Sequence, residues 1–236
     1  DIDDFSGGTA GNIVLDDQVV GLRSFRDDLI IFCKNSIWKL VNINTTAAKP
    51  IAVEPITKNI GCLDGKSIQE IGGDLVFLAP DGIRTLAGTV RIGDVELGTV
   101  SKQIQPLVTD LTESINSYII TSLVLREKSQ YRLFYTDTTK TNSEQRGIIG
   151  TLRPDGFQWS ETRGIEVTEI GSGFDQNGIE NYYHGDTDGF IYVHDSGNDF
   201  NGSNILARYA TPDYDYGDLG TLKTLHYLKV SASAEG

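Results

Sequence analysis

A thirteen-residue pattern that reads as a β-hairpin occurs three times without a gap, and it constrains the fold more than any other feature of the chain. The copies occupy residues 28–40, 74–86 and 181–193, each with a strand-like run, a turn and a second short strand. The turns fall at the same place, at Asn35-Ser36, Asp81-Gly82 and Asp188-Gly189. Because Asp-Gly between β-forming runs favours a tight turn, Asp81, Gly82, Asp188 and Gly189 are predicted structural turn residues, with positive φ at the glycines.

A fourth, stretched copy pairs residues 131–135 with residues 147–152 across a polar loop. Hairpins repeated at intervals of about 40 to 50 residues are typical of propeller blades. We therefore predict an all-β, β-propeller-like fold of repeated four-stranded antiparallel blades in a single domain over residues 1–236. The repeats are placed near residues 19–60, 67–100, 117–163 and 167–210, and residues 211–236 are expected to form a strand leading to a further blade or domain.

The hydrophobic pattern predicts the remaining elements. Strands are expected over residues 19–25, 50–57, 67–71, 117–125, 157–162, 167–174, 205–210 and 221–233. Apolar residues at helical spacing predict one short helix over residues 101–115, between the second and third repeats. Ser101 is the candidate N-cap, and Pro106 fits only if the helix begins just before it.

Composition bears on partners and compartment. A net charge of −13 disfavours a nucleic-acid groove, which needs clustered Lys and Arg. No run approaches the length of a membrane-spanning helix. Two cysteines do not make a disulfide framework, and Cys33 is expected to be a buried reduced thiol. The chain contains no methionine, so we expect it to be a fragment of a longer chain or a processed product.

Three segments resemble ligand-binding loops, but simple turns explain them better. Residues 61–67, GCLDGKS, have three residues between the glycines where a phosphate-binding loop has four, and a strand rather than a helix follows. Residues 186–189, DTDG, have alternating carboxylates but lack the later Glu of a calcium loop. Residues 175–178, DQNG, are interpreted as a similar turn. The sequence therefore predicts neither a metal site nor a cofactor site.

No set of residues is marked as catalytic. His184 and His194 lie ten positions apart in the fourth repeat, and together with His226 they are expected to be structural or surface side chains. A metal site usually needs three or more ligands. The chain shows no convincing Ser/His/Asp set and no marked pair of carboxylates for glycoside hydrolysis. We therefore predict that it is not an enzyme.

Aromatic side chains are the candidates for contacts with partners. Those of the fourth repeat are expected to fill the space between blades, although exposed rings can also stack on sugars or grip a partner; they are Tyr182, Tyr183, Phe190 and Tyr192. Three tyrosines lie in the polar segment YATPDYDYGD, which is the better candidate for a subunit contact; they are Tyr209, Tyr214 and Tyr216.

Four stretches, residues 26–40, 55–86, 91–107 and 209–236, resemble a known family. They are similar to virion structural proteins of tailed bacteriophages of the cyanophage and marine-phage type, and more distantly to the tail tubular or nozzle proteins of short-tailed phages. The resemblance implies β-propeller domains and a ring around the DNA exit channel. It also implies a non-enzymatic tail component, assembled in the host cytoplasm into the virion as a homo-oligomeric ring that contacts other tail proteins. No catalytic residue carries over.

Two other functions stay open at this point. One is a virion receptor-binding module that holds host surface glycan on the aromatics of the fourth repeat. The other is a propeller glycoside hydrolase.

Overall fold

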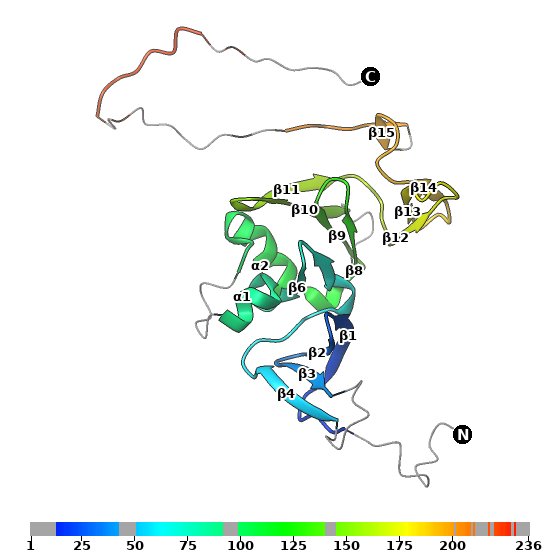
Figure 1. The fold of residues 1–236 in the computed structure, drawn as a ribbon. Coiled ribbons are helices and arrows are strands. Elements are labelled where there is room, and N and C mark those ends of the chain that lie inside the picture. Colours follow the sequence, from blue (N-terminus) through cyan, green and yellow to red (C-terminus); the bar gives the residue numbers. More distant parts are fainter. Residues whose placement is uncertain are drawn as a thin grey trace. The chain divides into compact units, whose positions relative to one another are not determined.

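The computed structural model describes residues 13–42, 51–91, 99–139 and 145–200, together with parts of the stretch 202–229. The chain divides into two compact parts, Asp1–Asp195 and Ser196–Gly236, which we describe separately. The first part contains four antiparallel meanders in succession, which we call sheets I to IV (Figure 1). In each meander every strand pairs with the next strand along the chain, in the antiparallel sense that a direct turn or loop allows.

Sheets I and III have four strands each. Sheet I comprises β1 (Val19–Phe25), β2 (Asp28–Cys33), β3 (Ile37–Val41) and β4 (Ala52–Thr57). Sheet III comprises β8 (Tyr118–Leu125), β9 (Gln130–Asp137), β10 (Arg146–Arg153) and β11 (Gly156–Arg163).

Sheets II and IV have three strands each in the described ranges. Sheet II comprises β5 (Gln69–Ile71), β6 (Asp74–Ala79) and β7 (Gly82–Thr85). Sheet IV comprises β12 (Glu169–Phe174), β13 (Glu180–Gly185) and β14 (Ile191–Val193). In sheet II, a single antiparallel bridge between Arg84 and Thr99 stands where a fourth strand would pair.

Short helices connect the sheets. The 3₁₀ turn η2 (Gly65–Ser67) precedes sheet II, and helix α1 (Leu86–Arg91) follows it directly. The turn η4 (Lys102–Ile104), helix α2 (Gln105–Glu113) and the turn η5 (Ile115–Ser117) then lead into sheet III. In the second part the described elements are the two short strands β15 (Asp199–Phe200) and β16 (Ser203–Asn204), which pair as a hairpin.

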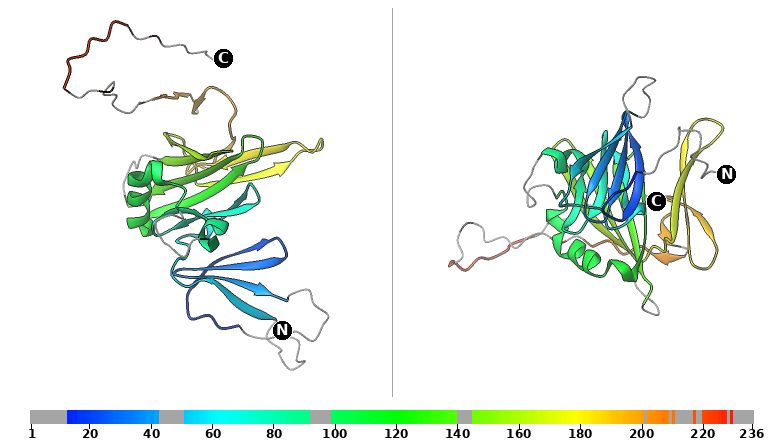
Figure 2. Two further views of the ribbon diagram at one scale, coloured as in Figure 1. Left: turned by 60° about the vertical axis from the view of Figure 1, so that its left-hand side comes forward. Right: turned by 90° about the horizontal axis from the view of Figure 1, so that it is seen from below.

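The sheets pack on one another in chain order, because the strands of sheet II are apolar on both faces. In β6, Leu75 and Phe77 contribute to one apolar core with sheet I, whereas Val76 and Leu78 contribute to a second core with sheet III. A continuous apolar run buried on both sides is the pattern expected of an internal strand. Figure 2 (left) shows sheets I, II and III as successive layers.

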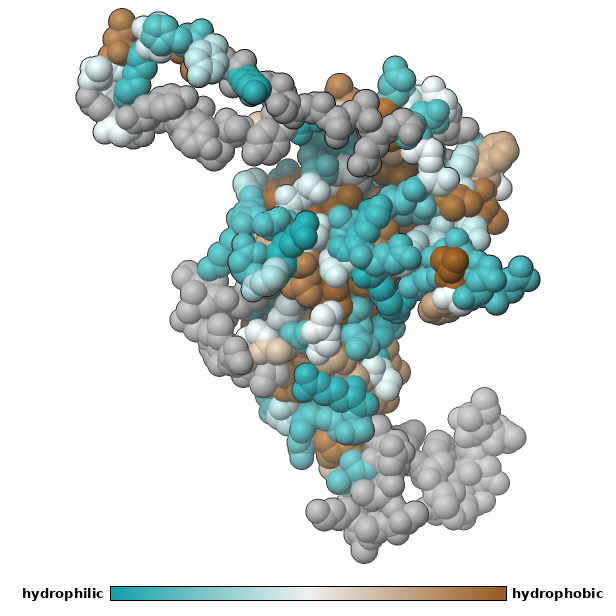
Figure 3. Space-filling model, turned by 45° about the horizontal axis from the view of Figure 1, so that its top comes forward, coloured by the Kyte–Doolittle hydropathy of each residue, from teal (hydrophilic) through white to brown (hydrophobic). Residues whose placement is uncertain are grey.

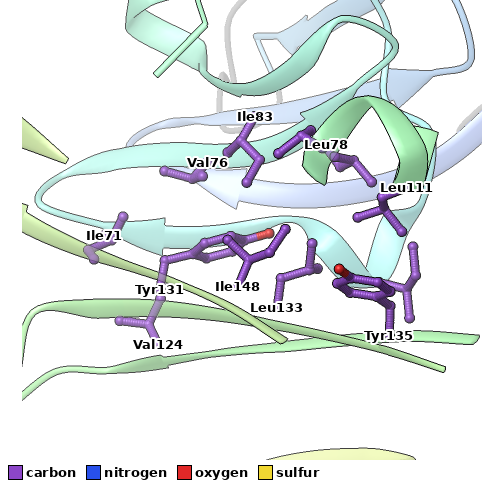
Figure 4. Packing of buried hydrophobic residues seen from close by; sticks show 12 residues of the cluster. Ile71, Val76, Leu78, Ile83, Leu111, Val124, Tyr131, Leu133, Tyr135 and Ile148 are labelled. Atoms are coloured by element: carbon purple, nitrogen blue, oxygen red, sulfur yellow. The ribbon is translucent and has the colours of Figure 1, made fainter. Parts of the chain in front are cut away.

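The core between sheets II and III is the largest apolar cluster among the described residues. Figure 4 shows Tyr131, Leu133 and Tyr135 of β9 lying opposite the apolar side chains of sheet II. Helix α2 adds Val108 and Leu111, both of which are fully buried. Alternate residues of β9 thus face sheet II, so the residues between them face the other side of sheet III.

The prediction of a mostly β protein made of antiparallel sheets is confirmed. The described residues contain no closed barrel or propeller. The helix predicted over residues 101–115 is present as α2, with Pro106 in its first turn. The proposed cap at Ser101 is wrong, because the Ser101 side chain makes no capping bond and its Oγ accepts from the backbone N–H of Ile83 at 3.0 Å.

Where the structure describes the second and fourth repeats, each has three strands in its sheet rather than the predicted four. After β7 the chain turns into α1, and the Asp74 carboxylate accepts from the backbone N–H of Ala87 at 3.1 Å near the start of that helix. The strand predicted over residues 205–210 is not formed in its described positions, and the same holds for residues 221–233. Each run has β-forming residues, but a strand also needs a partner to satisfy its backbone.

All three ungapped hairpins form, but one has a different register. Phe32 pairs with Ile37, and the equivalent Leu78 pairs with Ile83. The strands of the first two copies therefore pair in the same register. In the third copy Tyr183 pairs with Val193, one residue further on than the alignment predicts. The extra loop residue belongs to a turn built around the Asp186 carboxylate.

Candidate functional site

A connected group of four polar side chains, two of them buried, lies between sheets III and IV. We call it the Arg–His cluster, and it comprises Arg132, His184, His194 and Asp195. Arg132 lies on β9 among residues that face sheet II, so alternation turns its side chain to the opposite face of sheet III. His184 lies on β13, and His194 and Asp195 directly follow β14. Residues 62 or more positions apart are thereby brought into contact.

Arg132 and Asp195 form a two-point ion pair. Nη1 donates to Oδ1 at 2.6 Å and Nη2 donates to Oδ2 at 2.9 Å. Lys128 also contacts this carboxylate, and Gln130 Oε1 accepts from Arg132 Nη2 at 2.7 Å. Burial opposes ionisation of Asp195, but the hydrogen bonds from Arg132 and Lys128 outweigh it and hold the pKa of this carboxyl well below its ordinary value. The two planar Nη groups of a guanidinium match the spacing of the two oxygens of a carboxylate.

The two imidazoles continue the chain of hydrogen bonds. Arg132 Nη1 lies 2.8 Å from His194 Nε2, and His194 Nδ1 lies 3.1 Å from His184 Nδ1. A guanidinium only donates, so His194 Nε2 accepts and the proton of His194 sits on Nδ1. That proton is donated to His184, whose own proton is then on Nε2. Each link of the chain has one donor and one acceptor.

Burial lowers the pKa of both histidines and so favours their neutral forms. Burial, with the Arg132 charge adding to it, lowers the pKa of His194 to about 4. Burial also lowers the pKa of His184, against an opposing effect of Asp186. The rings are held by aromatic neighbours, since Phe134 meets His194 edge-on at 5.6 Å and Tyr192 stacks on His184 at 5.3 Å. These contacts place both imidazole rings in the packing between sheets III and IV.

Two loops of sheet IV use an aspartate to organise the backbone. Asp186 Oδ1 accepts from the N–H groups of Asp188 at 3.0 Å and Phe190 at 2.9 Å, and Oδ2 accepts from Tyr192 Oη at 2.9 Å. The loop at Asp175 repeats the pattern, with bonds from the N–H groups two and four residues further on. The glycines at the fourth position, Gly178 and Gly189, have φ of 77° and 87°. These carboxylates therefore bind their own loops.

The other predicted turn carries a buried arginine. Gly82 has φ of 143°, and a Cβ there would lie 2.7 Å from Ser101 Oγ. Asp81 accepts from Arg84 Nε at 2.8 Å, and the Arg84 side chain is fully buried. Pairing of Ala79 with Gly82 places Pro80 and Asp81 at the centre of the turn. Asp81 and Gly82 thus link sheet II to the segment that precedes α2.

The segment that resembles a phosphate loop is a packed connector. Asp64 caps η2 by accepting from Lys66 N at 2.7 Å, and Lys66 Nζ pairs with Glu169. Ser67 Oγ donates to the Asp64 carbonyl at 2.6 Å and accepts from Leu78 N at 3.1 Å. The polar groups of this connector therefore bond to sheets II and IV.

Three predicted contact residues lie outside the described part of the chain, and two residues of the Arg–His cluster were not predicted. Tyr209, Tyr214 and Tyr216 lie outside the described residues. Arg132 and Asp195 were not predicted at all. The one signal was a charged residue in the otherwise aromatic and apolar strand YRLFY, where burial demands a counter-charge. In the described ranges, no group of three or more His, Cys, Asp or Glu side chains is arranged to hold a metal ion.

The geometry defines a class of protein, a mostly β chain of antiparallel meanders joined by buried polar contacts. No protein-family model matches the chain, and no curated protein matches it. In the described part of the chain, no helix is long and apolar enough to cross a membrane.

Proposed function

We propose that the chain is a non-enzymatic structural component of a bacteriophage virion, part of a tail ring of the nozzle, tube or hub kind. The observation that carries the proposal is the face-to-face packing of consecutive meanders, which leaves an apolar face at each end of the series. The sequence segments that resemble phage tail proteins are the reason for placing this assembly in a phage tail. In this proposal the protein is assembled in the host cytoplasm and acts in the virion with other tail proteins.

We further propose that sheets I to IV are successive blades of a propeller. The first strands of neighbouring sheets contact one another, β12 with β8 and β8 with β5, and β1 contacts the η2 turn that precedes β5. In a propeller the innermost strands of adjacent blades are neighbours in this way. The polar contacts between sheets III and IV support a structural role, because each residue of the Arg–His cluster is bonded to another residue of the cluster.

The two end faces support assembly with further sheets. On sheet I, pairing aligns Leu22, Ile31 and Trp38 on the face opposite sheet II. On sheet IV, Tyr183 pairs with Val193, and both side chains are exposed, as is Ile191 at 78%. Figure 3 shows hydrophobic surface on the side of the molecule where Figure 1 places sheet IV. Contiguous exposed apolar side chains, as on sheet IV, mark interaction surfaces; on sheet I, Leu22 is the exposed member of the row and Ile31 is buried.

The first test is the protein content of purified virions. Mass spectrometry should detect peptides of this chain at several copies per particle, comparable with other tail-ring proteins. Absence from virions, combined with release of reducing sugar from a polysaccharide by the purified protein, would replace the structural proposal with the hydrolase.

A variant pair tests the end face. Replacing Ile191 and Val193 by Lys changes two exposed side chains, so the melting temperature should stay within about 2 °C while incorporation into tail rings is lost. The matched control replaces Gln158 and Ser160, two exposed side chains of the edge strand β11, by Lys, and incorporation should persist. Unchanged incorporation of the sheet IV variant would remove this face from the assembly.

One observation favours a second candidate, a receptor-binding module for host glycan. Three aromatic rings of sheet IV and its loops are exposed: Phe174 at 70%, Phe190 at 60% and Tyr183 at 43%. Exposed rings stack on sugar faces and anchor partners. Binding on a host-glycan array that is lost on Phe190→Ala would favour this function over a purely structural one.

A further inference from the structure

We propose that the Arg–His cluster is an acid-released latch, which holds sheet IV on sheet III while both histidines are neutral and releases it when they take up protons. This inference does not depend on the proposed function. It concerns how one sheet of the first part is fixed to the next.

The direction of each hydrogen bond carries the inference. Arg132 donates to His194 Nε2, and His194 Nδ1 donates to His184 Nδ1. A proton added to His194 at Nε2 meets the guanidinium 2.8 Å away, donor against donor and cation against cation. A proton added to His184 at Nδ1 meets the N–H of His194 at 3.1 Å. Protonation of either ring therefore breaks a link and adds charge repulsion.

The surrounding charges make the repulsion stronger than the opposing attraction. The charged and titratable groups that face the two rings are Arg132, Lys128 and Asp195 around His194, and Asp186 with Tyr192 around His184. Asp195 is already shared by Arg132 and Lys128, and Asp186 is bound by Tyr192 Oη and its own loop. An imidazolium in the cluster would thus lack a free carboxylate to pair with.

Few apolar contacts would keep sheet IV in place without the cluster. The described core between sheets III and IV comprises Leu123, Leu125 and Tyr182, with Ile170 packed against it. The core between sheets II and III is much larger. Local opening follows the regions with the fewest buried apolar contacts, so sheet IV is the element most easily released.

The experiment is hydrogen exchange of the chain at pH 7 and pH 5, corrected for the intrinsic rate at each pH. With a folded pKa of about 4 for His194 and an ordinary value of 6.5 after opening, the opening equilibrium of sheet IV should rise about 20-fold between pH 7 and pH 5. Amides of β5–β7 should change far less. Free carboxylates are still largely ionised at pH 5, so the histidines dominate this window.

A non-titrating variant provides the comparison. In the double variant His184→Asn and His194→Gln, the amide oxygens can still accept hydrogen bonds, and the pH effect on sheet IV should disappear. The control is His226→Gln, which removes an exposed histidine of the second part and should retain the wild-type response. A double variant with the full pH response would overturn the latch, as would equal protection of wild-type sheet IV at both pH values.

A second measurement on the wild-type protein covers the case in which the double variant does not fold. Long-range nitrogen–proton correlation spectra of the imidazoles report the tautomer of each histidine. At pH 7 the spectra should show His194 protonated at Nδ1 and His184 at Nε2, with His194 still neutral at pH 5. The opposite tautomer of His194, or a charged ring at pH 7, would contradict the hydrogen-bond chain.

Discussion

Gly61→Ala is expected to destabilise the first part strongly, although the change adds one methyl group. A Cβ at Gly61 would lie 2.3 Å from the Lys34 carbonyl carbon and oxygen and 2.4 Å from the Cys33 oxygen. These are backbone atoms of the β2–β3 turn, so no side-chain rotation can relieve the overlap. Cys62 N donates to the same Cys33 oxygen at 2.9 Å, and Lys34 N donates to Gln18 at 2.9 Å.

The magnitude follows from what must move. Ordinary contact is reached near 3.4 Å, so the turn must shift by about 1 Å and the hydrogen bond from Cys62 to Cys33 is lost, at about 1 kcal/mol. Strain from overpacking a well-fitted site adds about 1–3 kcal/mol. A less flexible unfolded chain offsets roughly 0.4–1 kcal/mol. The net loss is about 1–3.5 kcal/mol, or a fall in melting temperature of roughly 2 to 14 °C for a part of this size.

The assay is thermal and urea denaturation of Gly61→Ala beside Gly171→Ala. Gly171 lies on β12, and a Cβ there would meet nothing within 4 Å, so its variant should be neutral or slightly more stable. Equal melting temperatures for the two variants would refute the steric reasoning.

Three further substitutions test other parts of the structure. Leu75→Ala should lower the free energy of unfolding by about 2–5 kcal/mol in urea, because the side chain is buried between sheets I and II. Tyr131→Phe removes a hydrogen bond from Oη to the Ser67 carbonyl at 2.9 Å, and its urea midpoint should correspond to a loss of about 1–2 kcal/mol. Asp195→Asn leaves the Arg132 guanidinium without its counter-charge, and should lose about 2–4 kcal/mol at pH 7. The pKa of Asp195 is depressed, so its contribution is present above about pH 4 and lost as the pH falls further; the variant's acid unfolding curve should therefore be flatter than that of the wild type.

Local patterns in the sequence predicted much of the first part. Alternation and turn residues placed the hairpins, since side-chain direction in a strand and φ at a glycine depend on near neighbours. The 3.6-residue spacing of apolar side chains placed α2, and Pro106 fixed its start. The same reasoning failed at the third hairpin, because the Asp186 carboxylate binds two backbone N–H groups and enlarges the loop by one residue.

Contacts between distant residues were decided by the tertiary structure alone. No pattern near Arg132 in the sequence identifies Asp195, 63 positions away, as its partner. The contact between them depends on which face of sheet III packs against sheet IV. The two histidines were visible as a pair, but burial in the tertiary structure lowers the pKa of both, and Arg132 beside His194 sets its tautomer and lowers its pKa further. The sequence by itself thus determined the repeated hairpins, because hairpins are local. Only packing decided how many strands each repeat keeps and which polar groups lie between sheets, because burial joins residues that the chain keeps far apart.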